Sequence, residues 1–566
     1  MFLQEMRAVL NDDKMPTARD PKMIKHMQKY FNSPALFLKS AVLQEILVPA
    51  FIKLVDNPQL LEFFPDYTSF FQKNFLPSLI QDASPDSPLL KSVLPTEFPP
   101  AVASSVNTKD KKVTIINPTI SDSHNYTAMA WRGRTQWIST GVYAKQGELV
   151  TMKVPTRMIG KFKIRVGAHN CNLQKFNLER WMKNEKKWQK YRPAWVYQYY
   201  EKSLIKEETK ILTPYGGLIY VVIDLYNTLG DFDLEFKNVI ESARFVYGVS
   251  TNEQWAKDYE QMPAPMVELE VPGLIFTIPK LTMDSIDTDM EVLAHRWKII
   301  MDAVFDLQGF TPDLAIRYVT DVENDVGSAH SGYPIQHSHL PSRFFDSNHM
   351  NDSLIVPLHE IGHNLQDPRY TMGPGFAEVT NGFFINYVYD ELFGGHPEGN
   401  WTYIYTVIYR NNKEAKEEGK WLPYEHVCMI IKDNFGWEPF KQFFRYYLYH
   451  VPSVLSPNTQ ENSLSLMVKI LSKVYNKNLV PFFQWFNWPV LSDTIEETKN
   501  LPEWKGIIER LETVSAKCVF PMANFMGWKP CCQAKGEPCG EGEKKCTSDT
   551  QCEEGLACKW ETCNKK

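Results

Sequence analysis

The sequence lacks three features that would assign the chain to a class at once. No run of about 18 apolar residues occurs, so we expect no membrane-spanning helix. No block of basic residues stands out, and 61 Lys and Arg face 67 Asp and Glu, for a formal charge of -6 at pH 7. Nucleic acid is therefore not an expected partner. The N-terminal stretch MFLQEMRAVLNDDKMPTARD has no apolar core of the kind that a secretory signal peptide needs.

Cysteine is scarce before residue 518 and dense after it. Eight of the ten cysteines lie between Cys518 and Cys563. An even number at this density predicts a small disulfide-rich module, residues 518–566, whose short loops resemble those of knottins and toxins. Such modules normally form in an oxidising compartment, so we expect an extracellular or secreted protein although no signal peptide is visible. The module could dock the protein on a cell surface or a glycan, or it could only stabilise the chain end.

The hydrophobic pattern changes period along the chain, which predicts an α+β protein of several domains. Residues 1–98 have apolar residues at helical spacing, as in SPALFLKSAVLQEILVPAFIKLV (33–55), and end in a proline-rich linker. Residues 99–240 contain short β-branched runs bounded by Gly, Pro or Asn, which predicts a β-sandwich. Residues 241–517 return to helical spacing, as in MEVLAHRWKIIMDAVFDLQG (290–309), and predict a mainly helical domain.

The stretch VPLHEIGHNLQDPRYTMGPGFAEVTNG (356–382) has the residues most suited to chemistry. His359 and His363 are four positions apart, so a helix would present both imidazoles on one face. Glu360 projects near that face and could hold an attacking water. Two neutral imidazoles and one carboxylate would leave zinc an open coordination position, as in catalytic zinc sites. Because the pattern is short, an ordinary helix that happens to carry two histidines is the alternative.

A second predicted helix offers the third ligand. The turn TMGPG (371–375) separates the histidine helix from FAEVTNGFFINYVYDELF (376–393). Glu378 lies in the first turns of this second helix, from which it could swing back toward the same ion. Asn381, one turn further on, could hydrogen-bond a ligand. The alternative for Glu378 is a solvated carboxylate near a helix N-terminus, where the helix dipole favours negative charge.

These residues resemble those of a known family. HEIGHN (359–364) followed by AEVTNGFF (377–384) is similar to the signature of peptidase family M60, the enhancin-like zinc metallopeptidases. The resemblance extends over roughly residues 110–440 and includes four further segments. These are STGVYAKQGELVTMKVP (139–155), IRVGAHNCNL (164–173), YGGLIYVVI (215–223) and GSAHSGYPI (327–335). One departure is Gly382, where many members carry an amide residue.

The resemblance implies a fold and a role for each residue. Family members have a thermolysin-like (gluzincin) catalytic domain preceded by a β-sandwich. It implies that His359, His363 and Glu378 bind one Zn²⁺ ion and that Glu360 is the general base.

Stabilising the oxyanion of peptide hydrolysis takes a donor besides the ion. Gluzincins recruit tyrosine or histidine for this purpose, and the candidates are Tyr333, His330, His337 and Tyr370. Tyr333 is favoured because it lies in the family-like segment HSGYPI, and for each candidate a purely structural role is the alternative.

The resemblance also implies a substrate class. Many members cleave heavily O-glycosylated proteins such as mucins, so we expect a secreted zinc endopeptidase that acts on glycoproteins. The competing class is a non-catalytic binding or channel-associated regulatory protein on a peptidase-like scaffold, and a venom or defence component is a third possibility. A binding-only descendant would usually have lost a ligand or the base. All four residues are present here, which favours the peptidase.

Overall fold

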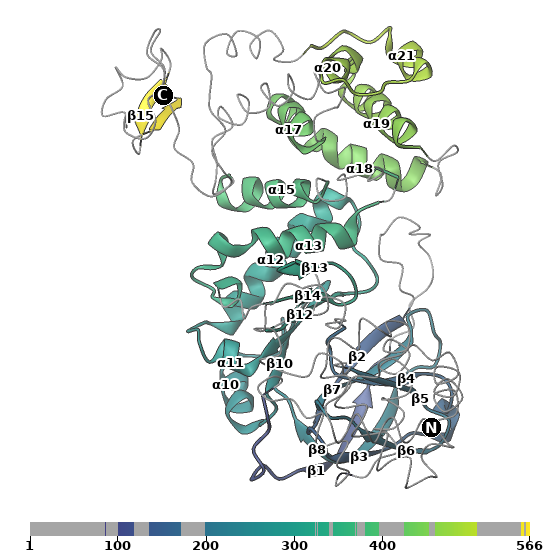
Figure 1. The fold of residues 1–566 in the computed structure, drawn as a ribbon, viewed down its shortest axis with the longest axis vertical. Coiled ribbons are helices and arrows are strands. Elements are labelled where there is room, and N and C mark those ends of the chain that lie inside the picture. The colour runs from purple at the N-terminus through teal and green to yellow at the C-terminus, as the bar shows by residue number, and fades with distance from the viewer. Residues whose placement is uncertain are drawn as a thin grey trace, which may run out of the picture. The chain divides into compact units, whose positions relative to one another are not determined.

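The computed structural model describes residues 85, 100–117, 135–170, 199–322, 324, 327–338, 343–367, 369–370, 380–395, 424–451, 459–505, 556–559 and 562–565 (Figure 1). The predicted helical region 1–98 lies outside them apart from residue 85, as does most of the predicted module 518–566. The described residues form two compact units. The first contains those of 85–301 and 311–356, and the second contains those of 302–310 and from 357 onward.

An eight-stranded sheet in the first unit forms the predicted β-rich part. Its strand order is β5-β4-β7-β2-β8-β3-β6, and β1 pairs with β8. The strands are β1 (Lys109–Ile115), β2 (Thr135–Ala144), β3 (Leu149–Lys153), β4 (Lys163–Val166), β5 (Tyr200–Ser203), β6 (Glu208–Leu212), β7 (Gly217–Asp224) and β8 (Phe232–Glu241). The long strand β8 pairs with β1, β3 and β2, and so joins the two halves of the sheet. Side chains from both halves, such as Val150 and Ile219, fill one core, as in a β-sandwich.

A six-stranded mixed sheet follows in the first unit, inside the region that the sequence predicts to be mainly helical. Its order is β13-β14-β12-β11-β10-β9. The strands are β9 (Arg244–Val246), β10 (Met266–Val271), β11 (Leu274–Pro279), β12 (Ile316–Thr320), β13 (Ala329–His330) and β14 (Ile335–His337), with helices α10 (Asn252–Gln261), α11 (Lys280–Met283) and α12 (Met290–Gln308) between them. Trp297 of α12 packs on Phe276 of β11 at 4.8 Å between ring centroids, so α12 covers this sheet.

A buried ion pair joins the two sheets of the first unit. Arg317 on β12 and Glu268 on β10 are 1% and 2% exposed, and their charged atoms lie 3.1 Å apart. Arg317 also donates to the carbonyl of Trp137 and, at 3.0 Å, to the hydroxyl of Ser139, both on β2. Tyr220 on β7 donates to Glu268 at 3.3 Å. Hydrogen bonds to this buried pair thus connect β2 and β7 of the eight-stranded sheet to β10 and β12 of the six-stranded sheet.

The second unit is helical in the part that the structure describes. Its helices are α13 (Ile355–Leu365, within this unit from Pro357 on), α15 (Gly382–Phe393), α17 (Tyr424–Phe435), α18 (Glu438–His450), α19 (Gln460–Tyr475), α20 (Val480–Trp485) and α21 (Ser492–Thr498). Aromatic rings pack α15 against α18, as between Phe383 and Phe440 at 5.2 Å. In the described ranges no helix has the length and apolar composition needed to cross a bilayer.

Two short strands are all that the structure describes of the predicted disulfide-rich module. They are β15 (Leu556–Lys559) and β16 (Thr562–Lys565), which pair antiparallel. The prediction of a disulfide framework in residues 518–566 otherwise falls outside the described residues and stays a prediction.

Candidate active site

Helix α13 confirms the predicted histidine helix. Pro357 lies in its first turn, where a missing N–H costs no hydrogen bond. Leu358, Ile361 and Leu365 are fully buried and anchor one face of the helix in the core. His359 and His363, on an adjacent face, are only half-buried. The packing of the apolar face therefore fixes the helix while both imidazoles stay accessible.

The two imidazoles converge on one point. The Nε2 atoms of His359 and His363 lie 3.1 Å apart, and the ring planes are nearly perpendicular at 88°. Two Zn–N bonds of about 2.05 Å at a tetrahedral angle separate the nitrogens by about 3.3 Å. The observed separation is close to this value, so the pair fits two ligands of a single zinc ion.

Glu360 lies between the two histidines in sequence and is 6% exposed. A carboxylate is seldom buried unless a partner compensates the loss of water. Burial beside two imidazoles suits a group that handles a proton inside a partly closed site.

The start of helix α15 packs closely against α13 through Asn381. The side-chain nitrogen of Asn381 lies 3.0 Å from Nε2 of His363, the nitrogen that would face the ion. The predicted role of Asn381 in hydrogen-bonding a bound ligand from outside the metal site stays a prediction. Asn381 is fully buried, and its amide oxygen has no hydrogen-bond partner among the described residues. A buried amide oxygen beside the histidine pair fits a site completed by a metal ion or a bound water.

Gln366 and Thr380 complete the surroundings of His363, and the sequence analysis did not identify either. The amide oxygen of Gln366 lies 3.0 Å from Nδ1 of His363, and its amide nitrogen donates to the hydroxyl of Thr380 at 2.5 Å. Both residues are buried. Gln366 lies one residue beyond the end of α13, and its own sequence surroundings gave no signal for this contact.

The predicted third ligand, Glu378, lies outside the described residues. Among the residues that the structure does describe, no three His, Cys, Asp or Glu side chains gather around one point. The assignment of Glu378 to the zinc ion therefore stays a prediction.

Tyr333, the favoured oxyanion donor, lies in the first unit. Its hydroxyl accepts a hydrogen bond from the backbone N–H of Trp137 at 3.2 Å, and its ring packs on that indole at 4.9 Å between centroids. Burial raises the pKa of Tyr333, so the phenol keeps its proton at neutral pH. It is therefore able to donate, but its role at the zinc site stays a prediction.

The other oxyanion candidates have neighbours of their own. His337 shares a hydrogen bond of 2.8 Å with the hydroxyl of Tyr318, and His330 contacts the carbonyl of Ser331 at 2.9 Å. Tyr370 is buried in an aromatic cluster with Tyr447 at 5.4 Å between centroids. These contacts are those expected of structural residues.

We expect Gly362→Ala to weaken zinc binding. A Cβ at Gly362 would lie 2.7 Å from Cβ of Asn381, closer than real Cβ contacts, and 3.0 Å from its Cα, which is tighter than most. To relieve the clash, the start of α15 must move away from α13, and Asn381 must move with it. In a helix, alanine is more favourable than glycine by about 1 kcal/mol, so the substitution should not weaken α13 itself. A loss of zinc affinity would therefore be due to the clash with Asn381. Competition titration with a chromophoric chelator measures it, and an unchanged affinity would show that the close approach is unimportant.

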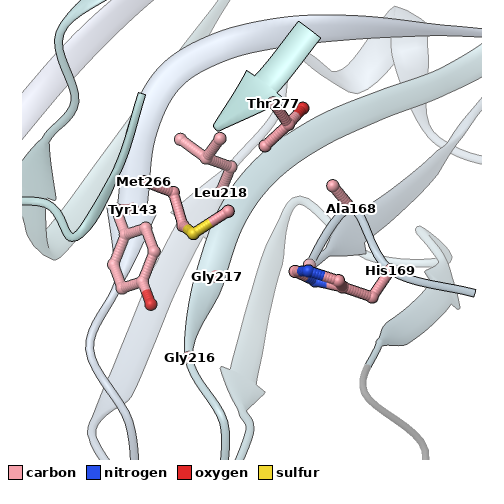
Figure 2. A pocket seen from close by; sticks show the side chains of 9 residues that line it. Tyr143, Ala168, His169, Gly216, Gly217, Leu218, Met266 and Thr277 are labelled. Carbon is pink, nitrogen blue, oxygen red and sulfur yellow. The ribbon is translucent and has the colours of Figure 1, made fainter. Parts of the chain in front are cut away.

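A small pocket in the first unit is a poor candidate for a substrate site. Figure 2 shows Tyr143 and His169 on opposite sides of Gly216 and Gly217. The pocket has about 270 Å³ of empty space, which includes adjoining solvent, and room for about one water molecule. His169 is paired with Asp321 at 3.2 Å, and the buried hydroxyl of Tyr143 has no partner among the described residues. These dimensions suit a bound water and exclude a peptide.

A helix with two converging imidazoles and a buried glutamate between them defines the HExxH class of peptidase-like proteins. Comparison with known proteins narrows the class. Residues 238–487 match the model of the family described as peptidase M60, enhancin and enhancin-like. Residues 117–236 match the N-terminal domain of M60-like peptidases. The chain therefore belongs to peptidase family M60, and neither match reaches residues 518–566.

The relatives of this chain include proteins named for a channel. A TRPM8 channel-associated factor homolog from Danio rerio is 28% identical over 400 residues, which cover 68% of this chain and 42% of the relative. The chain thus spans less than half the length of the curated relatives that it matches.

Solved structures share the fold at low sequence identity. A conserved protein of unknown function from Bacillus anthracis has a TM-score of 0.56 at 18% identity, over 70% of this chain and 80% of that one. The IMPa metallopeptidase from Pseudomonas aeruginosa, solved with T-antigen, has a TM-score of 0.53 at 13% identity, over 81% of this chain and 62% of that one. At such identities the likeness shows the fold alone.

Proposed function

We propose that this chain is a zinc-dependent endopeptidase that cleaves peptide bonds in O-glycosylated, mucin-like proteins. One observation carries the peptidase part of the proposal. The Nε2 atoms of His359 and His363 lie 3.1 Å apart on a helix that also carries the buried Glu360. The relatives' names and the fold alone would suit a non-enzymatic protein equally well, whereas this arrangement is the one that hydrolysis needs.

Each residue has a defined role in the proposal. His359 and His363, with Glu378 as the proposed third ligand, hold the zinc ion. Zinc supplies a Lewis acid that polarises the scissile carbonyl and lowers the pKa of water toward about 7. The carboxylate of Glu360 accepts the proton of the attacking water and delivers it to the leaving nitrogen. The amide nitrogen of Asn381 lies 3.0 Å from the same Nε2 atom of His363 and would have to release it when the ion binds.

The proposed substrate class is supported by what related folds bind. The IMPa metallopeptidase has been solved with T-antigen and with an O-glycopeptide, at TM-scores of 0.53 and 0.51 to this chain. Transfer of that substrate class to this chain is part of the proposal. Two further parts of the proposal are an extracellular location and a role for residues 518–566 in docking on a cell surface or glycan. Both are inferred from the density of cysteines in residues 518–566.

A channel-associated regulatory role is the second candidate. It is favoured by the similarity to the TRPM8 channel-associated factor homolog from Danio rerio. Binding to a channel would require neither the converged imidazoles nor the buried glutamate. Zinc-dependent hydrolysis therefore separates the two candidates.

We expect the purified protein to cleave mucin and to cleave it much less after the O-glycans are removed. If the glycan contributes one or two charge-assisted or bidentate hydrogen bonds, its removal should lower kcat/KM by about tenfold to a hundredfold. Fragment analysis by mass spectrometry, before and after treatment with O-glycosidases, measures the ratio.

The same digest distinguishes the other outcomes. Equal cleavage of glycosylated and bare protein would overturn the glycan-directed part of the proposal and leave the peptidase part standing. Zinc-loaded protein that cleaves neither substrate, nor a panel of unglycosylated peptides, would favour the channel-associated candidate.

A further inference from the structure

A row of buried hydrogen bonds leads from Thr380, two residues before helix α15, to one candidate zinc ligand. Thr380 accepts from the amide nitrogen of Gln366 at 2.5 Å, and the amide oxygen of Gln366 lies 3.0 Å from Nδ1 of His363. Gln366 is 3% exposed and Thr380 is 1% exposed. Water therefore does not compete for these contacts, and the geometry of the row is set by the packing of α13 on α15.

The direction of these bonds decides which imidazole nitrogen has the proton. An amide oxygen can only accept, so Nδ1 of His363 must be the N–H donor. A neutral imidazole has one N–H, which leaves Nε2 with its lone pair. Nε2 is the atom that lies 3.1 Å from Nε2 of His359 and 3.0 Å from the amide of Asn381. The tautomer selected by Gln366 is therefore the one that can bind a metal on the side of the histidine pair.

The orientation of the Gln366 amide matters for the tautomer. If the amide turned by 180°, its nitrogen would donate to Nδ1 of His363, and the proton would have to move to Nε2. That tautomer cannot coordinate an ion through Nε2. The amide nitrogen of Asn381, which can only donate, faces Nε2 at 3.0 Å and would then meet a second N–H, so the observed orientation is favoured. The hydroxyl of Thr380 can donate as well as accept, so it fits either orientation.

We propose that Gln366 is a positioning residue that fixes His363 in its metal-binding tautomer. The inference rests on the proposed zinc-peptidase function and adds one residue to it. The effect of Gln366 is on how readily the site takes up zinc.

Zinc affinity of the full chain, measured by competition with a chromophoric chelator, tests this assignment. Gln366→Met removes the acceptor and should weaken zinc binding about tenfold to a hundredfold. Gln366→Glu has two oxygens and no donor, so it selects the same tautomer and should bind zinc at least as tightly as the wild type. Thr380→Val removes only a partner of the Gln366 amide nitrogen, so it should weaken zinc binding less than Gln366→Met does.

A matched control separates this effect from a general loss of stability. Thr494 is a buried threonine in the same unit whose hydroxyl bonds to that of Ser465 at 2.8 Å. Thr494→Val should lower the thermal unfolding midpoint and leave zinc affinity unchanged. Cobalt(II) substitution gives a second readout, since the intensity of the visible bands reports whether the ion keeps its tetrahedral ligands.

The outcomes distinguish this inference from the proposed function. Wild type that binds zinc, with Gln366→Met binding it equally well, overturns the inference and leaves the function standing. Wild type that binds no zinc overturns the proposed function, and the inference with it.

Discussion

Replacing Glu360 with glutamine is expected to abolish peptide hydrolysis while zinc binding is retained. The amide has the size of the carboxylate but cannot accept a proton from water at neutral pH. Loss of a general base costs about 10²–10⁴-fold in rate. Because Glu360 is buried on a helix whose apolar face anchors it in the core, the isosteric change should leave the fold intact.

Turnover of a glycosylated substrate and zinc content, measured on the same preparation of Glu360→Gln, test this expectation. Glu391→Gln on α15 is the control, since this glutamate is exposed and should tolerate the change with activity intact. A Glu360→Gln variant that cleaves at the wild-type rate would show that another group moves the proton. A variant that loses zinc as well would show that Glu360 helps to hold the ion.

Replacing Arg317 with methionine should destabilise the first unit by about 3–5 kcal/mol, because the change leaves Glu268 buried without its counter-charge. Both side chains are almost completely buried, and Arg317 also provides the hydrogen bonds to β2 that join the two sheets. The double variant Arg317→Met with Glu268→Gln should recover part of this loss, because no uncompensated charge remains. Denaturant unfolding followed by tryptophan fluorescence measures the difference.

A neighbouring pair provides the control for burial. Arg244 and Glu270 form an ion pair between β9 and β10 of the same sheet, but their side chains are 34% and 29% exposed. Arg244→Met should cost no more than about 1 kcal/mol, as for other partly exposed pairs. Equal losses from Arg317→Met and Arg244→Met would mean that the buried network does not join the sheets.

The elements that the sequence predicts are those with a strong local pattern. The run TQWISTGVYA coincides with β2 (Thr135–Ala144), and the amphipathic stretch 290–309 coincides with α12 (Met290–Gln308). Strands β12, β13 and β14 of the six-stranded sheet had no such pattern. All five residues of β12 are buried, so polar and apolar residues do not alternate, and β13 and β14 have only two and three residues.

The candidate site was predictable only in part, because only some of its residues follow a local sequence pattern. His359, Glu360 and His363 follow a local spacing that a helix turns into geometry, and the amide of Asn381 was expected near a ligand. Gln366, just after α13, contacts Thr380, just before α15, and nothing in their own sequence surroundings marks them. The same holds for Arg317 and Glu268, which meet only because the strands β10 and β12 lie in one sheet.

Zinc content of the purified full chain, measured by mass spectrometry after dialysis against zinc and then against buffer, tests the central claim most directly. The account predicts one zinc ion per chain for the wild type and almost none for His363→Ala, because removal of one imidazole leaves the convergent pair incomplete. Wild type that retains no zinc, or His363→Ala that retains as much as the wild type, would contradict it.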